Sequence, residues 1–561
     1  MKKDTKNELD KYREFEENID IVVDKFDYSS FYLNDVLDFF HINIASKYSG
    51  EKFSTNEYKI EPSSSFSSAL SYLLPLLNNC KKDFNRNYFE NTFIKKMIDF
   101  TPTLIKYGLF SEVAPFIWRK VYIPNINAKT LRMYYDTNYY EFEVKDAILT
   151  AIATGISATN DLEDYVLYDL HVQDIINSRG VIPSNNIIIE TIKSKKWYKE
   201  YRFDDLIVSQ NVYLELDISK DEYVEFQSFW LGITTYYIKT YEALIRYART
   251  RAKVDDDLVQ ILISYFASPN ILKTSFYTKF DKLIGLSEDK FYRLMNIFSL
   301  NIYDEFKLQD GHYPVFIEYE DLYLFSPFNV RVQLSPRNLL YLLNKNETKN
   351  FNDNISKHLE PELINYCIDL LKKIPHLEVQ SNVNWGTNGE FDIIAYDTLK
   401  NNILHFQAKA SIPVEGARMT QNLESRINEG ISQIEKFNKQ SSIKKDDIVS
   451  KIFRKNIKNP VYIDIIVGWG GFGTYNTWKS LNEKTITALN IAVLNQYIKK
   501  YEDNYNLSNF YNDINELINE IINSSNPKKI TNKLKIGNYK ISYESFDYQK
   551  TKLFKYRYIP Y

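Results

Sequence analysis

The chain has 561 residues, with 70 Lys and Arg against 73 Asp and Glu and a formal net charge of −3. This near balance excludes a protein that is basic throughout, so any contact with nucleic acid must come from a local basic patch. Hydrophobic residues make up 44% and charged residues 25% of the chain, which is typical of globular proteins. The length predicts two to four domains.

The two cysteines, Cys80 and Cys367, are too few for a disulfide framework and predict reduced thiols. The first residues lack the apolar core of a secretory signal. No apolar run reaches the length of about 18 residues that a membrane-spanning helix needs. We therefore expect a cytoplasmic protein without a membrane partner.

Hydrophobic periodicity predicts that residues 1–345 are mainly helical. His41, His171 and His312 are isolated, without metal-binding spacing around them. No nucleophile-elbow sequence indicates a Ser-His-Asp site, although residues distant in sequence can still form one. The expected roles are scaffold, target recognition, or contact with a partner protein or a second copy of the chain. The expected helices cover residues 65–78, 93–109, 145–156, 222–251 and 255–266, and residues 312–330 are expected to form a hairpin followed by a turn.

The polar segment 344–354 is expected to be a linker, followed by a second domain over residues 354–505. This domain is expected to open with a helix over residues 355–374, in which Pro361 occupies the first turn of a restarted helix. A short strand is expected over residues 378–383.

Residues 389–410 predict an antiparallel hairpin, because two alternating arms flank a polar break at residues 397–402. On the first arm, odd-numbered residues such as Phe391 are expected on one face and even-numbered residues such as Asp392 on the other. This alternation predicts that Asp392 faces the same side as polar residues of the second arm.

A turn centred in the break pairs Asp392 with Gln407, and Glu390 with Lys409. The Asp392 carboxylate, the Gln407 amide oxygen and the nearby carbonyl of Ala408 are the hard oxygen ligands that Mg²⁺ prefers. On the same face, Lys409 could orient or help deprotonate a bound water. The alternative is the solvated polar face of an ordinary hairpin.

Asp392, followed by Gln407-Ala408-Lys409 on the next strand, resembles the PD-(D/E)xK nuclease superfamily. The resemblance is strongest to the Mrr-like restriction endonuclease branch, in which Gln replaces the acid of the third motif. It covers about a quarter of the chain and depends on the order helix, strand, strand with Asp, strand with Gln-x-Lys, helix, strand. Two departures are the neutral Gln407 itself and Phe391, which stands where the superfamily motif has Pro.

The resemblance implies a restriction-endonuclease-like α/β domain behind a mainly α N-terminal region. It also implies that Asp392, Gln407 and Lys409 are catalytic, and that Asp392 and Gln407 hold Mg²⁺, with Mn²⁺ as a substitute. In the family an acidic residue of the first helix commonly faces the active site. Glu360 matches that position, Glu362 competes with it, and a solvated surface Glu is the alternative.

The helix after the Lys strand is expected over residues 415–438. In the family this helix packs beside the active site, and its polar residues can touch phosphate. Arg418, Arg426 and Gln433 are the candidates here, against the alternative of a solvated face. The lysine-rich segment that follows contains Lys444 and Lys445 and offers phosphate contacts, unless it is simply a solvated loop.

The glycine-rich run at residues 468–473 lacks the spacing of a dinucleotide loop and is interpreted as a tight exit from a sheet strand at residues 461–467. A further strand is expected at residues 486–494 and a helix at 495–501. Residues 506–561 are expected to form an extension with a helix and a terminal β-ribbon.

We therefore expect a Mg²⁺-dependent nuclease that hydrolyses phosphodiester bonds, with DNA favoured over RNA. A large helical region joined to a nuclease domain suggests an endonuclease of a bacterial restriction or antiphage defence type, by analogy of architecture only. The alternative is a catalytically silent nuclease-fold subunit that binds nucleic acid or a partner. In a third hypothesis the protein is structural and the hairpin is incidental.

Overall fold

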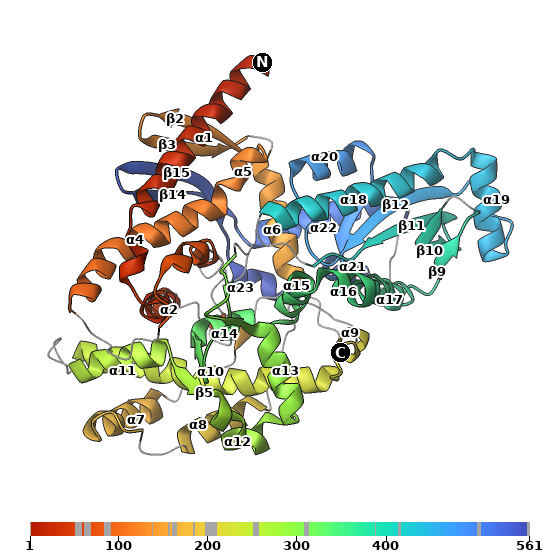
Figure 1. Cartoon of the computed structure of the whole chain (residues 1–561). Coiled ribbons are helices and arrows are strands. Elements are labelled where there is room, and N and C mark those ends of the chain that lie inside the picture. Colours follow the sequence, from red (N-terminus) through yellow and green to blue (C-terminus); the bar gives the residue numbers. More distant parts are fainter. Residues whose placement is uncertain are drawn as a thin grey trace.

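Helices dominate the N-terminal region, and a helix-covered five-stranded sheet follows it (Figure 1). The predicted combination of a mainly α region with an α/β region is therefore confirmed at that level. The computed structural model describes residues 2–50, 59–60, 69–83, 91–136, 139–154, 158–159, 165–182, 186–196, 210–250, 257–307, 313–386, 389–412, 417–501 and 507–557. Within this part of the chain, no helix combines the length and the apolar character that crossing a membrane requires.

A 31-residue helix, α10, forms the centre of the N-terminal region, as its long apolar pattern predicted. It packs against α7, α8, α11 and α14, and its Phe229 and Trp230 are fully buried. The helices of this bundle are α7 (Tyr165–Asn177), α8 (Asn186–Lys196), α9 (Gln210–Leu214), α10 (Lys220–Thr250), α11 (Asp257–Ala267), α12 (Lys273–Ile284), α13 (Glu288–Phe298), α14 (Pro327–Gln333) and α15 (Pro336–Asn346).

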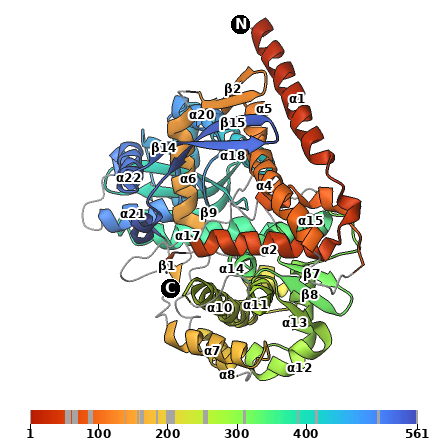
Figure 2. The same cartoon turned by 90° about the vertical axis from the view of Figure 1, so that its left-hand side faces the viewer.

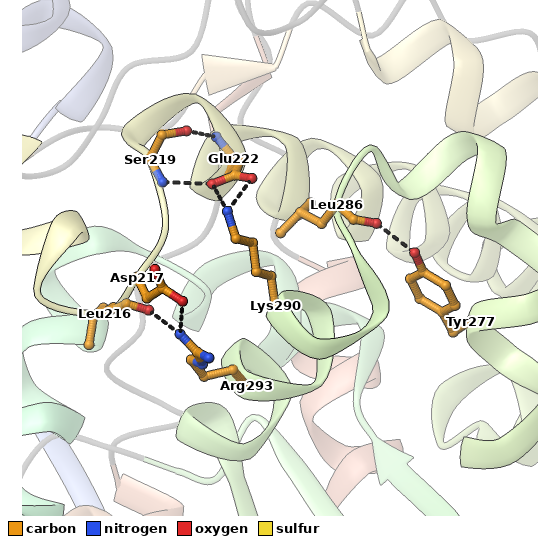
Figure 3. Close-up of polar contacts among 8 residues, drawn as sticks. All are labelled: Leu216, Asp217, Ser219, Glu222, Tyr277, Leu286, Lys290 and Arg293. Atoms are coloured by element: carbon orange, nitrogen blue, oxygen red, sulfur yellow. Dashed lines mark hydrogen bonds and ion pairs between the residues drawn. The ribbon is translucent and has the colours of Figure 1, made fainter.

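A capping box fixes the start of α10. The Ser219 N–H donates to the Glu222 carboxylate at 2.8 Å, and the Glu222 N–H donates to the Ser219 hydroxyl at 3.1 Å (Figure 3). From α13, Lys290 pairs with Glu222 at 2.8 Å and Arg293 pairs with Asp217 at 3.0 Å. The polar residues of this entry loop therefore anchor two helices to each other.

The hairpin expected in residues 312–330 is present as β7 (Phe316–Tyr319) and β8 (Leu322–Phe325). The expected turn after it is wrong, because Pro327 opens α14 with Ser326 as its cap. His312 lies outside the described residues. Strands β7 and β8 belong to a sheet of order β5-β8-β7-β6, with β5 (Asn270–Leu272) and β6 (Ser299–Asn301), and a separate two-stranded sheet pairs β1 (Lys59–Ile60) with β4 (Ala158–Thr159).

The rest of the N-terminal region combines long helices with a hairpin that local pattern did not predict. That hairpin, β2 (Tyr122–Asn127) and β3 (Thr130–Tyr135), pairs with the C-terminal ribbon β14 (Lys528–Ile536) and β15 (Tyr539–Asp547) in the order β14-β15-β3-β2 (Figure 1). The predicted ribbon is thus confirmed, and it joins the two ends of the chain. The helices are α1 (Lys2–Asp24), α2 (Leu33–Gly50), α4 (Asn91–Val113), α5 (Pro115–Trp118) and α6 (Tyr139–Thr154).

The helices predicted at residues 93–109 and 145–156 correspond to α4 and α6. The one predicted at residues 65–78 is seen only in part, since residues 61–68 are outside the described part of the chain and residues 74–79 form a 3₁₀ helix. Cys80 and Cys367 are buried free thiols.

The expected linker at residues 344–354 is helical, which corrects the prediction of a loop. After α15 the chain continues through α16 (Thr348–Asn350), a π-helical turn (Phe351–Ile355) and a 3₁₀ turn (Ser356–His358) into α17 (Leu359–Leu371). Phe351 and Ile355 are buried, so this polar segment is held by two apolar anchors.

The C-terminal sheet has the strand order β13-β12-β11-β10-β9. Strands β9, β10 and β11 are antiparallel neighbours, whereas β12 and β13 run parallel to β11. The sheet lies between α18 on one side and α17 with α21 on the other (Figure 1). Its elements are β9 (Leu377–Asn384), β10 (Glu390–Asp397), β11 (Asn402–Lys409), α18 (Ala417–Asn438), α19 (Ser442–Phe453), β12 (Val461–Gly468), α20 (Tyr475–Glu483), β13 (Thr487–Asn490), α21 (Ile491–Lys500) and α22 (Phe510–Ser524).

Helix α6 of the N-terminal region packs against α20, α21 and α22 of the C-terminal region, beside which it runs upright in Figure 2. Its Asp146 carboxylate accepts hydrogen bonds from the N–H groups of Phe472 and Gly473 at 2.5 and 3.0 Å, and from the Trp478 indole at 3.1 Å. The glycine-rich run is therefore a tight loop held by a buried acid. The run leads directly into α20.

Candidate active site

The register predicted for the hairpin is confirmed over five residue pairs. Strands β10 and β11 pair from Ile393–Phe406 to Asp397–Asn402, around the expected turn. The Asp397 side chain accepts hydrogen bonds from the N–H groups of Leu399 and Lys400 and so closes this turn. The ladder ends at Ile393, however, so Asp392 and Gln407 lie just beyond the paired part of the two strands.

The regular alternation of β10 breaks at Asp392, which corrects the predicted faces. Phe391 packs with Phe437 of α18 at a ring distance of 4.9 Å, and it shares that core with Ile394, whereas Ile393 lies in the main core. Opposite the break, Asn382 of β9 has a φ of 52°. Asn tolerates this left-handed conformation better than most residues do. The irregularity gives Asp392 an orientation that plain alternation would not.

Beyond the end of the ladder, the side chain of Asp392 connects β10 to β11. Its carboxylate accepts a hydrogen bond from the Ala408 N–H at 2.7 Å, and the Lys409 ammonium lies 3.8 Å from the same oxygen. On the other side of Lys409, a Cβ at Gly430 of α18 would come within 3.0 Å of the Lys409 Cε. Glycine at this position therefore gives the lysine the room to reach Asp392.

Gln407 is fully buried beside this pair. Its Nε2 donates to the backbone carbonyl of Glu390 at 3.1 Å, but its Oε1 has no hydrogen-bond partner among the described residues. A buried amide oxygen left without a partner costs about 1–3 kcal/mol, so a native structure that keeps one needs an explanation.

Of the two helix acids, Glu360 is the one on which the charges of the hairpin residues act. The pKa of Glu360 is raised by burial, and it also responds to the charges of Lys409, Asp392 and Arg426. The pKa of Glu362 is likewise raised by burial, but the charge that acts on it is that of Lys220, at the start of α10. Of the two helix acids, Glu360 therefore remains the candidate for the site.

Burial also raises the pKa of Asp392, and this effect outweighs the opposing effects of Lys409 and the Ala408 N–H. The charge of Asp392 in turn raises the pKa of Glu360, which burial has already raised. A divalent cation bound by these carboxylates and the Gln407 oxygen would offset the burial of two negative charges and would give the amide oxygen a partner. This donor set therefore fits a hard cation. No cluster of three or more His, Cys, Asp or Glu suited to a metal occurs in the described part of the chain. Cation binding at this site would therefore need the Gln407 amide oxygen as a ligand in addition to the carboxylates.

The proposed nucleic-acid contacts divide into two groups. Arg426 is exposed on α18, and its charge acts on Glu360. About two turns further along, the Gln433 Oε1 is buried without a partner among the described residues. Arg418 lies in the first turn of α18, and its side chain is outside the described residues.

Lys444 and Lys445 belong to α19, which forms where a loop was the alternative. The Lys445 ammonium lies 4.4 Å from the centre of the Tyr462 ring, and Tyr462 is the β12 neighbour of Ile403. Six residues of β11 separate Ile403 from Lys409, roughly 20 Å at the rise of an extended strand. These lysines are therefore not brought to the Asp392 cluster.

A polar cluster that sequence patterns missed lies in the N-terminal bundle. The Ser268 hydroxyl donates to Asp38 at 2.5 Å and lies 2.7 Å from Nδ1 of His41, and all three residues are buried. The serine stands between the acid and the histidine, so the histidine is not oriented by the acid as in a hydrolase triad. His171 contacts the Tyr236 hydroxyl at 3.1 Å. Both histidines are buried, and each contacts a hydroxyl group of the N-terminal region.

Comparisons with known proteins identify no relative of this chain. No protein-family model, no curated protein and no solved structure matches it.

Proposed function

We propose that the C-terminal region is a metal-dependent nuclease domain of the restriction-endonuclease-like type, acting on phosphodiester bonds. The single observation that carries the proposal is the grouping at the end of β11. There the Lys409 ammonium lies 3.8 Å from the Asp392 carboxylate, and the charges of both act on Glu360. Gln407, two residues before Lys409 on β11, has a buried Oε1 without a partner among the described residues. The proposal is also supported by the order of elements along the chain, in which α17 and β9 precede β10 with Asp392 and β11 with Gln407 and Lys409, and α18 and β12 follow.

In this proposal Asp392 and Gln407 hold Mg²⁺, and Glu360 adds negative charge to the site. The ion would neutralise charge developing on the scissile phosphate and would lower the pKa of the attacking water. Because the Ala408 N–H holds one oxygen of Asp392, the other oxygen is left to face the ion. The ammonium of Lys409 can donate hydrogen bonds to the attacking water or to the phosphate.

Duplex DNA is the substrate that we propose first. Arg426 beside the site and the exposed Lys444 on α19 provide positive charge at two places on the C-terminal region. The large N-terminal region, which contacts the α18 side of the domain through Arg119 and Glu424 at 2.7 Å, would then serve recognition or restraint, as in a restriction or antiphage effector.

The test is cleavage of supercoiled plasmid and of single-stranded RNA by the purified full chain with Mg²⁺ or Mn²⁺. Lys409→Ala and Asp392→Asn are expected to lower the rate at least 100-fold, since Asn can still accept from the Ala408 N–H and keep the fold. Lys373→Ala, at an exposed position beyond α17, is the matched control. Cleavage that survives Lys409→Ala in metal-replete protein would refute the assignment.

A second candidate is a catalytically silent subunit with the same fold. The neutral Gln407 and the lack of a three-acid cluster in the described residues favour it, because less negative charge weakens cation binding. This candidate predicts nucleic-acid binding that needs no divalent cation and no cleavage under any metal condition.

A further inference from the structure

We propose that His405 and Asp464 are positioning residues that fix the orientation of the Gln407 amide, so that its oxygen and not its nitrogen faces the active site. The inference rests on the proposed function, in which that oxygen binds the cation. It assigns roles to two residues outside the Asp-Gln-x-Lys motif.

The three side chains form a continuous chain of contacts across β11 and β12. Nδ1 of His405 lies 3.1 Å from Oδ1 of Asp464, and Nε2 of His405 lies 3.4 Å from Nε2 of Gln407. The other oxygen of Asp464 accepts from the Asn438 side chain of α18 at 2.5 Å. Asp464 is thus held by a helix that packs on the sheet.

The chemistry of these groups permits one consistent assignment. A carboxylate can only accept, so Nδ1 of His405 carries the proton, and a neutral imidazole then presents the lone pair of Nε2 to Gln407. The backbone carbonyl of Glu390 is likewise only an acceptor, and it lies 3.1 Å from the same amide group. Both neighbours therefore select the NH₂ end of the Gln407 amide.

The opposite orientation would place Oε1 against two acceptors. At 3.4 Å the contact with His405 is longer than a typical hydrogen bond, so it acts mainly by excluding that orientation. With the NH₂ group taken, the buried Oε1 remains free for a cation. Partners behind a ligand commonly change metal affinity by 10–100-fold when they are removed.

The surroundings of His405 explain why it cannot turn away. Its ring is 1% exposed and packs edge-on against Phe391 at 4.8 Å and Phe437 at 5.5 Å. A polar chain inside an aromatic core is costly unless each member is satisfied. Among the described side chains of this polar chain, the Gln407 Oε1 is left without a partner, and it is the oxygen that the proposed function requires.

Two replacements of similar size separate the proposed role from a purely structural one. His405→Gln places an amide near the position of Nε2 and can still accept from Gln407, whereas His405→Asn reaches only the position of Nδ1 and leaves Gln407 without this neighbour. In the full chain, Mn²⁺ affinity measured by calorimetry is expected to fall at least 10-fold in His405→Asn. In His405→Gln it should stay within about 3-fold of the wild type.

Selective ¹⁵N labelling of histidine supplies a readout that does not depend on activity. The His405 resonances, identified by their loss in His405→Gln, are expected to show the neutral tautomer with the proton on Nδ1. Equal losses of Mn²⁺ affinity in both variants, or a proton on Nε2, would overturn this inference while leaving the proposed function intact. If the wild-type chain binds no Mn²⁺, this inference and the proposed function are both refuted.

Discussion

The buried group of Asp38, Ser268 and His41 makes a quantitative prediction about stability. Burial raises the pKa of Asp38 to about 8, although the Ser268 hydroxyl opposes this, and burial lowers the pKa of His41 to about 3. The change to test is Asp38→Asn, since an amide oxygen can still accept from the Ser268 hydroxyl while the titrating group is removed.

The magnitude follows from proton linkage. The unfolded pKa of Asp is about 3.9. Between about pH 4 and pH 8, the folded protein therefore keeps a proton on Asp38 that the unfolded chain has already released. The stability contributed by protonated Asp38 is complete below pH 4 and is lost as pH rises toward 8, by about 1.4 kcal/mol per pH unit. Between pH 5 and 8, Asp38→Asn should therefore gain about 4 kcal/mol relative to the wild type.

His41 contributes with the opposite sign. Its folded pKa is lowered, so its stability contribution rises with pH up to the unfolded value of about 6.5. Between about pH 4 and pH 6.5, the pH-dependent contributions of Asp38 and His41 to the free energy of unfolding therefore nearly cancel in the wild type. The wild-type chain should therefore lose stability mainly between pH 6.5 and 8, whereas Asp38→Asn should gain stability up to pH 6.5 and then level off.

The measurement is the thermal unfolding midpoint of both proteins at half-unit steps from pH 5 to 8. For a cooperative unit of 150–250 residues, about 4 kcal/mol corresponds to a shift on the order of 10 °C. The same change at the exposed Asp353 is the control. A difference between wild type and Asp38→Asn that does not vary with pH would refute the reasoning. Any loss of cleavage in Asp38→Asn would contradict the structural role of the group.

Three further predictions concern the C-terminal region. Gly430→Ala should leave Mn²⁺ binding unchanged but lower plasmid cleavage about 10-fold or more, because its methyl group displaces the Lys409 ammonium; an unchanged rate would show that Lys409 does not need this space. Asp146→Ala should cost roughly 3–5 kcal/mol in thermal unfolding, since three donors lose a buried acceptor, and a loss under 1 kcal/mol would contradict its anchoring role. Mn²⁺ at ten times its Kd should stabilise the wild type by about 1.4 kcal/mol relative to EDTA and should not stabilise Asp392→Asn.

Local sequence patterns predicted the elements that are formed by contacts between residues close in the sequence. The period-two arms and polar break at residues 389–410 predicted both the hairpin and its register, because the turn length sets the pairing. The apolar stripe of α10 predicted the central helix for the same reason. Asp392, Gln407 and Lys409 could be selected together because one turn brings two adjacent strands into contact.

Features that depend on distant partners required the tertiary structure. The pairing of β3 with β15 joins strands about 400 residues apart, and nothing local in residues 122–135 indicates it. The choice of Glu360 over Glu362 depended on which charge each one meets across the fold. His405 lies two residues before Gln407 on the same strand face, so alternation could have suggested it.

Asp464 had no such signal, because its own strand β12 follows two helices and meets β11 only in the folded structure. The sequence alone therefore determined which residues share a hairpin, since neighbours along the chain restrict one another. The surroundings of β11, which carries Gln407, were decided only when α17, α18 and β12 packed against this strand, since its burial comes from residues far apart in the chain.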